Sequence, residues 1–593
     1  MNNDKILLEV KNLKKYFPLQ KNLFGKPKFH LKAVDDVSFK LQAGKTIGVV
    51  GESGCGKTTL GRTILQLYDT TGGKTLYYGH SLEEFQPKYY VKEINQLTSL
   101  QSKLDNLKNK LSVCNIDDTK LNFDDSITIK DYETKIINLK SLLATINKED
   151  SKYKIVANAV KDLEELVNLL ISAATSTGGL IFGDAAKASD LLITKLKIEK
   201  DLNNLLITKL KIEKDLNDLL NAKQIIEKDL NDLLDEKSKI EVDSANKDDN
   251  SKSIDKLKQK LEKMLSSTNK SIDKLKQELV KLEDSISKTN EMLSSTNNLI
   301  DELKKNIVKT NLYIDLEQRR EKGIDLAKLT KGEMRSLRTE IQLIFQDPYS
   351  SLPPRMTVGS ILTEAVKVHK IVEKDEIKQH IRDIMKKCGL QPQYYDRYPH
   401  EFSGGQRQRI CIARALAVNP KLVICDEPVS ALDVSIQAQI INLLKDLQND
   451  LGLTYMFISH DLSVVKYITD NIIVMYLGNM MEIGDTDDIF DEPLHPYTQA
   501  LFSAVPVPDP DAKKQRIILQ GDIPSPANPP KGCKFHTRCE KCMSVCKVKQ
   551  PEFVQYNEKH IVACHLYNEE IMSNLAKYDE ELASLEQVKV ENE

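Results

Sequence analysis

The sequence predicts an α/β fold in which a parallel sheet carries a phosphate-binding loop, interrupted by a long helical insertion. Three observations support this prediction. Residues 51–58, GESGCGKT, fit the phosphate-binding pattern G-x-x-x-x-G-K-[ST] at every position. Strand-like and helical runs alternate before and after a central region. That region, between Pro87 and Pro348, contains no proline and repeats leucine-rich units.

Length and composition exclude several classes of protein. The 593 residues are enough for two to four domains. A net charge of -2 gives no indication of a nucleic-acid partner. No run approaches the roughly 18 apolar residues that a membrane span needs, and residues 1–5 lack the basic-then-apolar start of a signal peptide. We therefore expect a cytosolic protein, one that is still able to dock on a membrane protein.

The residues around the phosphate-binding pattern predict the local structure that the pattern requires. Residues 6–10 and 34–39 are strand-like, and residues 45–50 form a buried type of strand that ends at the loop. Residues 59–68 are predicted to form a helix. A strand, a glycine-rich loop and a helix in this order favour a site for the phosphates of a nucleotide.

The insertion contains a repeated unit of 14 residues, LLITKLKIEKDLN followed by Asn or Asp. It starts at Leu191, at Leu205 and, in a looser copy, at Leu219. Fourteen residues are two heptads. With Leu191 as position d, every later d position as far as Ile240 is leucine or isoleucine, which is typical of a coiled coil. Lysine at every second a position weakens the predicted seam.

Other features of the insertion predict where its helices change. Residues 253–259 and 271–277 both read SIDKLKQ, and because their offset of 18 is not a multiple of seven, we expect the seam to slip or unwind there. Small residues within 172–189 and a polar stretch at 248–251 predict turns. Two interpretations are open. One is a folded-back helical arm, in which about 80 residues would reach on the order of 120 Å. The other is a disordered, low-complexity insert.

The globular pattern resumes at residue 323. Strands that alternate with helices predict a parallel sheet in this second part. The chain becomes rich in proline from residue 492 and then in cysteine, and a charged helical tail is expected from residue 569. The predicted strands lie at 423–424, 455–458 and 472–475, and the clearest predicted helix is at 434–451.

Residues on both sides of the insertion supply the chemistry of nucleotide hydrolysis. Lys57 is expected on the β- and γ-phosphates, and the Thr58 hydroxyl on Mg²⁺. Asp426 ends an apolar strand, where a carboxylate reaches the Mg²⁺ shell, and Glu427 is placed to activate the attacking water. The loop residues expected around the nucleotide are Gly51, Glu52, Ser53, Gly54, Cys55, Gly56, Lys57, Thr58 and Thr59.

Three segments after the insertion resemble the ATP-binding cassette family. They are EFSGGQRQR at 401–409, DEPVSALD at 426–433 and SHD at 459–461, and their order and spacing match the family's motifs. The resemblance implies an α/β, P-loop ABC-type nucleotide-binding domain with an antiparallel β subdomain and a helical subdomain. Its implied cofactors are ATP and Mg²⁺.

The same resemblance assigns roles to further residues. It implies that Ser403, Gly404 and Gly405 of the 401–409 segment cap the γ-phosphate of ATP held by a second cassette, and that Gln406 and Asp433 also bind nucleotide. Gln346 resembles the loop glutamine that senses Mg²⁺, and His460 the histidine that holds the γ-phosphate and works with Glu427. Phe17, or else Tyr16, would stack on adenine.

A narrower resemblance is to the oligopeptide and dipeptide importers of this family. It rests on GESGCGKTT at 51–59, FQDPY at 345–349, RMTVG at 355–359 and LHPYT at 494–498, and the loop cysteine resembles the F member of the D/F pair of ATPase subunits. It implies ATP hydrolysis coupled to peptide uptake at the cytoplasmic face of the cell membrane. The implied partners are a second ATPase subunit, two transmembrane permease subunits and an extracellular peptide-binding protein. Dipeptide and nickel importers share these motifs and are open alternatives.

The cysteines near the C-terminus resemble the cysteine module of these importers. The module is formed by Cys533, Cys539, Cys546 and Cys564, after GDIPSP at 521–526. The resemblance implies a [4Fe–4S] cluster held by four thiolates. Cys542 forms an additional Cys-x-x-Cys pair with Cys539, so a tetrahedral zinc site is an alternative, and free thiols are a third.

Together these features predict five parts of the chain. Residues 1–80 and 320–490 form the nucleotide-binding domain, 81–319 the insertion, 491–567 the cysteine module and 568–593 the tail. A coiled-coil ATPase of DNA repair or chromosome organisation is a distant alternative, since its arm would follow the glutamine loop and this insertion ends before Gln346. A translation-factor cassette protein would need two phosphate loops, and this sequence has one. We expect no nucleic-acid partner, and an unknown protein as partner of the insertion.

Overall fold

The protein folds as two compact units in the structure, a computed structural model that describes residues 5–21, 27–116, 119–147, 150–242, 248–505, 516–575 and 578. One unit combines Met1–His80 with Gly323–Glu593, and the other is Ser81–Lys322. The strands on the two sides of the second unit pair with each other, Leu76 with Asp325 and Tyr77 with Ile324. The insertion therefore leaves and re-enters the first unit at one position in a sheet.

That sheet is antiparallel and has four strands in the first unit. Its order is β2 (Pro27–Gln42), β1 (Ile6–Lys21), β4 (Gly72–Tyr77) and β7 (Ile324–Asp325). The strands predicted at 6–10 and 34–39 are confirmed as parts of the two 16-residue strands. Register shifts in the β1–β2 pairing, near Asn12 and Asp36 with their positive φ angles, bend these strands.

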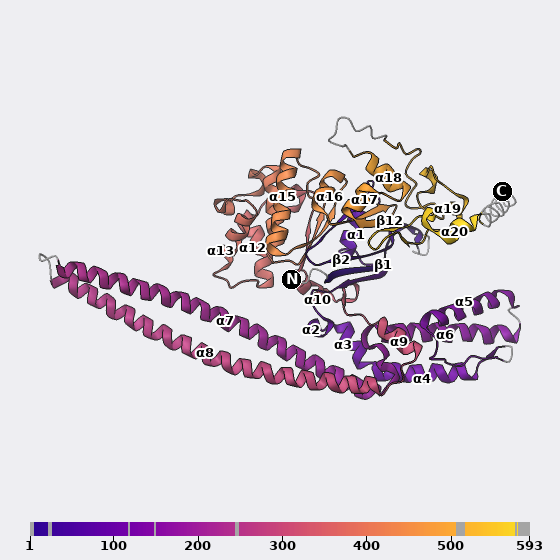
Figure 1. Cartoon of the computed structure of the whole chain (residues 1–593), viewed down its shortest axis with the longest axis horizontal. Helices are drawn as coiled ribbons and strands as arrows, with labels where there is room; N and C mark the ends of the chain where they lie inside the picture. The colour runs from indigo at the N-terminus through magenta and orange to yellow at the C-terminus, as the bar shows by residue number, and fades with distance from the viewer. Residues whose placement is uncertain are drawn as a thin grey trace. The chain divides into compact units, whose positions relative to one another are not determined.

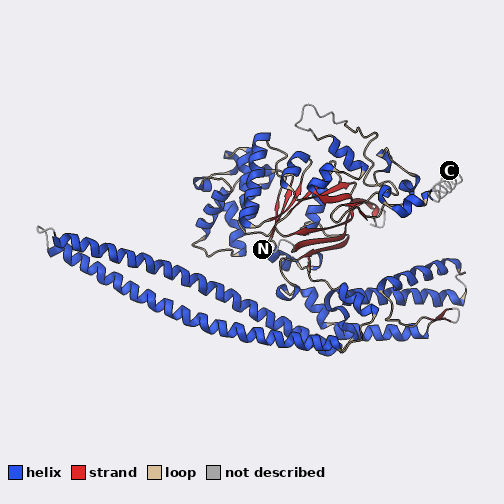
Figure 2. Cartoon of the chain, viewed as in Figure 1, coloured by secondary structure: helices blue, strands red, loops and turns tan. Residues whose placement is uncertain are grey.

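The second sheet of this unit has eight strands in the order β13-β14-β12-β11-β3-β10-β9-β8. The strands of this unit are red in Figure 2, with blue helices around them. The five strands from β11 to β8 are parallel, as predicted, and β3, β9 and β10 are buried along their whole length. Parallel strands end at one edge, which brings the end of β3 near the end of β9. The strands are β3 (Thr46–Val50), β8 (Ile341–Ile344), β9 (Leu422–Asp426), β10 (Thr454–Ile458), β11 (Asn471–Tyr476), β12 (Asn479–Asp485), β13 (Val554–Gln555) and β14 (Ile561–Val562).

Helices pack around this sheet and form a larger helical region after β8. The helix predicted at 434–451 is confirmed as α15. The helix predicted at 59–68 begins earlier and ends at Ile64, because Gln66 adopts a left-handed φ of 53°. The helices are α1 (Lys57–Ile64), α10 (Lys331–Leu337), α11 (Pro348–Ser351), α12 (Val358–His369), α13 (Ile377–Lys387), α14 (Gly404–Leu416), α15 (Val434–Leu451), α16 (Leu462–Ile468), α17 (Thr486–Asp491), α18 (Pro496–Ser503), α19 (Ser544–Val548) and α20 (Glu569–Ser573).

The cysteine-rich segment is built into the same sheet. Its short hairpin β13–β14 pairs with β12, with Val562 opposite Glu482. The fully buried Glu482 carboxylate accepts hydrogen bonds from the N–H groups of Leu494 and His495 and pairs with His560. Of the predicted helical tail, α20 is described, and most residues after 575 lie outside the described residues.

The second unit begins with a bundle of shorter helices. A small hairpin, β5 (Asn115–Ile116) with β6 (Thr119–Lys120), joins the bundle. The turn predicted within 172–189 is confirmed, since α6 ends at Thr177 and a 3₁₀ turn covers Gly178–Phe182. The bundle helices are α2 (Leu82–Phe85), α3 (Lys88–Asn95), α4 (Leu97–Val113), α5 (Ile129–Thr145), α6 (Ser151–Thr177) and α9 (Asn311–Gln318).

Two long helices, α7 (Ala185–Val242) and α8 (Asp248–Lys305), extend from this bundle side by side (Figure 1). The d positions Ile198 and Ile226 are 7% and 8% exposed, and Lys209 at an a position pairs with Glu283 of α8 at 2.8 Å. Each helix has 58 residues, which is about 87 Å of length, so the predicted reach of about 120 Å was too long.

The break expected at 248–251 falls at the boundary between two helices. Since α7 ends at Val242 and α8 begins at Asp248, residues 248–251 are the first turn of α8. Of the two outcomes expected at the SIDKLKQ copies, a slip of the seam or an unwinding, unwinding does not occur, because 18 residues are five full turns of a helix with 3.6 residues per turn. The isoleucine of each copy therefore lies on the same covered face, with Ile254 8% and Ile272 4% exposed.

The prediction that no segment is long and apolar enough to span a membrane needs a correction. Among the described residues, one helical stretch, Lys152–Phe182, passes that test with a mean hydropathy of 1.3. Of its apolar window, 72% is buried inside the structure. Since the core helix of a soluble bundle has the same length and composition, this stretch is weak evidence for a span.

Candidate nucleotide-binding site

The phosphate-binding pattern forms a tight loop between β3 and α1. Gly51, Gly54 and Gly56 have φ angles of 148°, 79° and 105°, which favour glycine. A side chain at Gly56 would also come within 2.1 Å of the Ala33 carbonyl oxygen. The ammonium of Lys57 donates to the carbonyl oxygens of Gly51 and Glu52 at 2.8 and 3.1 Å, so it lies inside the loop. The loop and the start of α1 together provide an anion-binding geometry.

A hydrogen bond between two oxygen side chains that suit Mg²⁺, Thr58 and Asp426, joins the two chain segments of the first unit. The hydroxyl of Thr58, in the first turn of α1, donates to Oδ1 of Asp426 at 2.7 Å. Asp426 is 1% exposed at the end of β9, with Arg62 at 3.6 Å from its other oxygen. Burial raises the pKa of the Asp426 carboxyl, although the Thr58 hydrogen bond and the Arg62 charge oppose that shift. A hydroxyl and a carboxylate at this distance suit an Mg²⁺ ion, which prefers oxygen ligands.

Glu427, the next residue, has two polar groups beside one oxygen of its carboxylate. Its φ angle of 47° turns the chain sharply, and its N–H donates to the Ile458 carbonyl oxygen. Oε2 of Glu427 accepts a hydrogen bond from Nε2 of Gln346 at 2.8 Å and lies 3.3 Å from Nδ1 of His460. The sequence predicted all three residues at one site, and the structure brings them together there.

A cavity of about 310 Å³ opens beside the loop. Phe17 lines it, whereas Tyr16 instead bonds Asp35 through its hydroxyl. Of the two aromatic residues considered from the sequence, only Phe17 is therefore near the loop. Sequence reasoning missed further lining residues that no phosphate-loop motif marks, and these are Leu31, Lys32, Ala33, Gly478 and Pro526.

The 401–409 segment, which contains the Ser403–Gln406 motif, lies apart from this cavity. Ser403 caps α14, and its side chain accepts the Gln406 N–H while the Gln406 side chain accepts the Ser403 N–H. Asp433 lies at the N-terminus of α15 with its side chain exposed. Among the described residues that line the cavity, none comes from this motif. The loop of one chain therefore lacks these groups as neighbours.

The cysteine cluster is buried but not arranged around a single ion. Cys533, Cys546 and Cys564 are 7–9% exposed. Burial, with the neighbouring thiols as smaller causes, raises the pKa of the Cys533 and Cys564 thiols to about 12 and that of Cys546 to about 11. In the part of the chain that the structure describes, no three His, Cys, Asp or Glu side chains form a group that could hold a metal ion.

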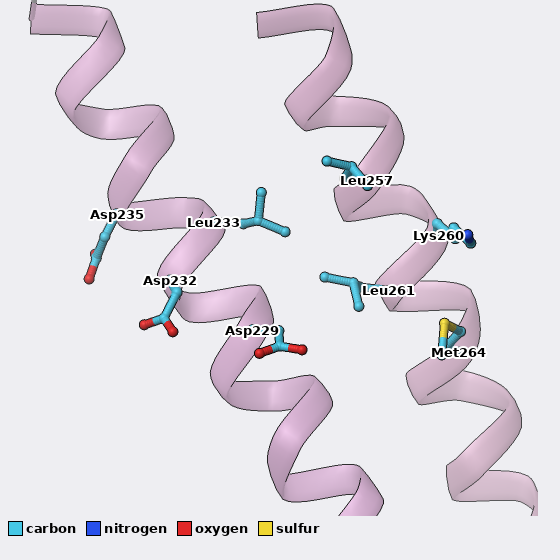
Figure 3. Close-up of a pocket in the computed structure, with 8 residues that line it drawn as sticks. All are labelled: Asp229, Asp232, Leu233, Asp235, Leu257, Lys260, Leu261 and Met264. Carbon is cyan, nitrogen blue, oxygen red and sulfur yellow. The ribbon is translucent and has the colours of Figure 1, made fainter. Parts of the chain in front are cut away.

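A second cavity, of about 640 Å³, lies between α7 and α8. In Figure 3, Leu233 of α7 points toward Leu257 and Leu261 of α8. Although this cavity is larger than the one beside the loop, it has no glycine-rich backbone to bind phosphate, and aspartates line its rim. Since an aspartate-lined surface repels phosphate, we assign the nucleotide to the smaller cavity.

Two family models and several known proteins match parts of this chain. The chain matches the family described as "ABC transporter" over residues 34–171 and 310–430, and the "Oligopeptide/dipeptide transporter, C-terminal region" over residues 481–546. The oligopeptide transport ATP-binding protein AppF of Bacillus subtilis (strain 168) is 54% identical over 250 residues, which are 42% of this chain and 76% of that protein. The oligopeptide transport ATP-binding protein OppF of Haemophilus influenzae is 52% identical over 245 residues, which are 41% of this chain and 74% of that protein. The chain therefore belongs to the ABC transporter ATPases that carry the oligopeptide/dipeptide transporter C-terminal region.

Proposed function

We propose that this chain is the ATP-hydrolysing subunit of a membrane importer of oligopeptides. The observation that carries the proposal is the pairing of Thr58 with Asp426 beside the Glu427–Gln346 hydrogen bond. This arrangement suits Mg²⁺, the γ-phosphate and an attacking water in one place. The names of the relatives AppF and OppF favour oligopeptides as the transported substrate.

In this proposal each residue of the site has a separate role. Lys57 and the loop N–H groups bind the phosphates, and Phe17 stacks on adenine. Thr58, Asp426 and Gln346 hold Mg²⁺ directly or through water. Glu427 orients and deprotonates the attacking water, and His460 holds the γ-phosphate close to it. The chemistry that Mg²⁺ supplies when bound is neutralisation of charge on the phosphates.

A second cassette subunit completes the site. The separation of the Ser403–Gln406 motif from the loop cavity supports this, because those groups are free to contact a nucleotide on another subunit. Closure of two cassettes around ATP would then change the conformation of two transmembrane permease subunits. The complex would lie at the cytoplasmic face of the membrane and receive peptides from an extracellular binding protein.

The chain is proposed to divide as the sequence predicted. Residues 1–80 and 320–490 are the nucleotide-binding domain, 81–319 an insertion, 491–567 the cysteine module and 568–593 a tail. We propose that α7 and α8 form an antiparallel coiled coil that binds a partner protein. The covered d positions and the Lys209–Glu283 pair support the seam.

We also propose that Cys533, Cys539, Cys546 and Cys564 hold a [4Fe–4S] cluster. After burial, the neighbouring thiols of Cys546, Cys564 and Cys539 raise the pKa of Cys533, and those of Cys546 and Cys539 raise the pKa of Cys564, so these cysteines lie near one another. A cluster bound by four cysteines places each thiolate on a different iron, whereas zinc needs all four around one ion. A tetrahedral zinc site at the same cysteines is the alternative. Iron and sulfide analysis of protein purified without oxygen tests this.

Two measurements test the function. Binding of fluorescent ATP should be lost in Lys57→Ala, and full retention of binding would contradict the assigned site. The tagged chain purified from its native membranes should bring a second ATPase subunit, two multi-span proteins and a peptide-binding protein. Recovery of nucleic-acid-processing partners without any membrane protein would overturn the importer assignment.

A further inference from the structure

The first variable residue of the phosphate loop, Glu52, is held from outside the loop. Its N–H donates to the hydroxyl of Tyr497 at 2.9 Å. Its two carboxylate oxygens accept hydrogen bonds from one guanidinium nitrogen of Arg538, at 3.2 and 2.9 Å. Both the backbone and the side chain of Glu52 therefore bond to residues more than 440 positions away.

Arg538 belongs to the cysteine module. It precedes Cys539 directly and follows Cys533 by five positions. The Arg538 side chain is 8% exposed and the Glu52 side chain is 23% exposed. The ion pair between them is therefore shielded from most solvent. A partly buried ion pair with two charge-assisted hydrogen bonds is stronger than an exposed pair, and losing one partner leaves the other charge unpaired.

An aromatic cluster fixes the direction of the Arg538 side chain. Phe535, three residues earlier in the module, packs edge-on against Tyr476 at the end of β11, with ring centroids 5.4 Å apart. It also lies 5.3 Å from the Tyr497 ring, and Tyr497 lies 4.8 Å from Tyr476. The hydroxyl of Tyr476 accepts a further hydrogen bond from Arg538 at 3.4 Å. The module, β11 and α18 thus form one rigid support for Glu52.

The loop has little freedom apart from this support. A side chain at Gly51 would come within 2.2 Å of the Met475 carbonyl oxygen, so the loop begins in direct contact with the end of β11. Glu52 lies between that contact and the glycines that turn toward Lys57. A change in the position of Glu52 therefore changes the direction of the N–H groups that follow it.

We propose that Arg538 is a positioning residue of the nucleotide site, through which the cysteine module holds the phosphate loop in its binding conformation by way of Glu52. The proposal rests on the proposed ATP site. It also implies that Glu52 contributes as an anchor of the loop rather than as a ligand of phosphate, since both its N–H and its carboxylate bond to this support. Arg538 would act through Glu52 without touching the nucleotide.

The experiment measures the affinity of the full-length chain for fluorescent ATP, together with kcat and KM for hydrolysis. We expect Arg538→Met to weaken binding about tenfold and to raise KM while kcat changes little, because Arg538 does not touch the reacting atoms. Arg538→Lys, which keeps the charge, should recover most of the affinity. Lys547→Met removes a charge from the exposed surface of the same module and is the matched control.

A double-mutant cycle separates positioning from general stability. Glu52→Gln should weaken binding as Arg538→Met does, and the double variant should be no weaker than either single variant. If Arg538→Met lowers the melting temperature but leaves nucleotide affinity within about twofold of the parent, the residue only stabilises the module and the proposal is wrong. If Arg538→Met does not fold, Glu52→Gln is combined with Arg538→Lys instead. Losses of nucleotide affinity that simply add in this double variant would also show that the proposal is wrong. Retained binding in Lys57→Ala would instead contradict the ATP site itself.

Discussion

Oγ1 of Thr58 lies 2.7 Å from Oδ1 of Asp426, although 368 positions separate the two residues. The insertion occupies most of that separation, yet the flanking strands β4 and β7 are paired. The pair is formed because β3 and β9 both flank β10 in a parallel sheet and end at the same edge. The contact depends on the sheet and not on the insertion.

The first prediction concerns Asp426→Asn. We expect a loss of about 100-fold in Mg²⁺-dependent hydrolysis, because the amide cannot replace a carboxylate ligand. Burial raises the pKa of the Asp426 carboxyl in the folded, nucleotide-free protein. Deprotonation therefore costs stability as the pH rises, and the variant should melt at a higher temperature than the parent at pH 8 without Mg²⁺. This difference should shrink at lower pH, and melting curves at both pH values without nucleotide check it.

The second prediction concerns Glu427→Gln. One oxygen of its carboxylate contacts both Gln346 and His460, so the substitution should remove the base and preserve the shape. We expect hydrolysis to fall by about 10² to 10⁴-fold while ATP affinity stays within about threefold. Steady-state hydrolysis and equilibrium binding check this, with Glu373→Gln, an exposed glutamate of the same unit, as the control. Undiminished hydrolysis in Glu427→Gln would remove Glu427 from the mechanism.

Much of the nucleotide site was predictable from the sequence because its residues occur in short motifs with fixed local geometry. The loop at 51–58 follows a buried strand, and Asp426 ends another, so a parallel sheet was enough to bring them together. Phe17 was harder, since Tyr16 is also aromatic and β1 places the two residues on opposite faces. Only the alternation along the strand decides which of them lines the cavity.

Contacts between distant segments were not predictable. The Arg538–Glu52 pair has no local signature, because neither residue belongs to a pattern that names the other. The pairing of β14 with β12 was also missed. The reason is that β14 has two residues, and a strand this short carries too little periodicity to be predicted. At the SIDKLKQ copies the sequence left a slip of the seam and an unwinding both open, and α8 stays helical there because a spacing of 18 fits 3.6 residues per turn.

The third prediction concerns removal of the insertion. Deleting residues 82–321 and joining the ends with a short Gly/Ser linker should leave ATP affinity and basal hydrolysis within about threefold of the parent. The reason is that Tyr77 already pairs with Ile324, while His80 and its partner Glu340 are both retained. Binding of fluorescent ATP checks this. A folded deletion variant that no longer binds ATP would show that the insertion takes part in the site.

The fourth prediction concerns the pH dependence of the second unit. Burial raises the pKa of Glu199 in α7 to about 7, with Glu83 and Glu84 adding to the shift and Lys195 opposing it. Oε2 of Glu199 has no hydrogen-bond partner among the described residues. Because the folded-state pKa is above the unfolded value, the proton's contribution to stability is complete below the unfolded pKa and is lost as the pH rises through about 7.

Glu199→Gln should therefore stabilise the second unit at pH 8, by about 1–3 kcal/mol, and change little at pH 4.5. Thermal unfolding of the full chain, followed by helical circular dichroism at both pH values, measures this. The repeat supplies a close control, since Glu213 occupies the same position in the next copy and also lies beside a lysine, Lys209. Its side chain is 42% exposed against 20% for Glu199, so Glu213→Gln should show no such gain. Equal gains in the two variants would mean that loss of a negative charge from α7, and not burial of Glu199, causes the effect.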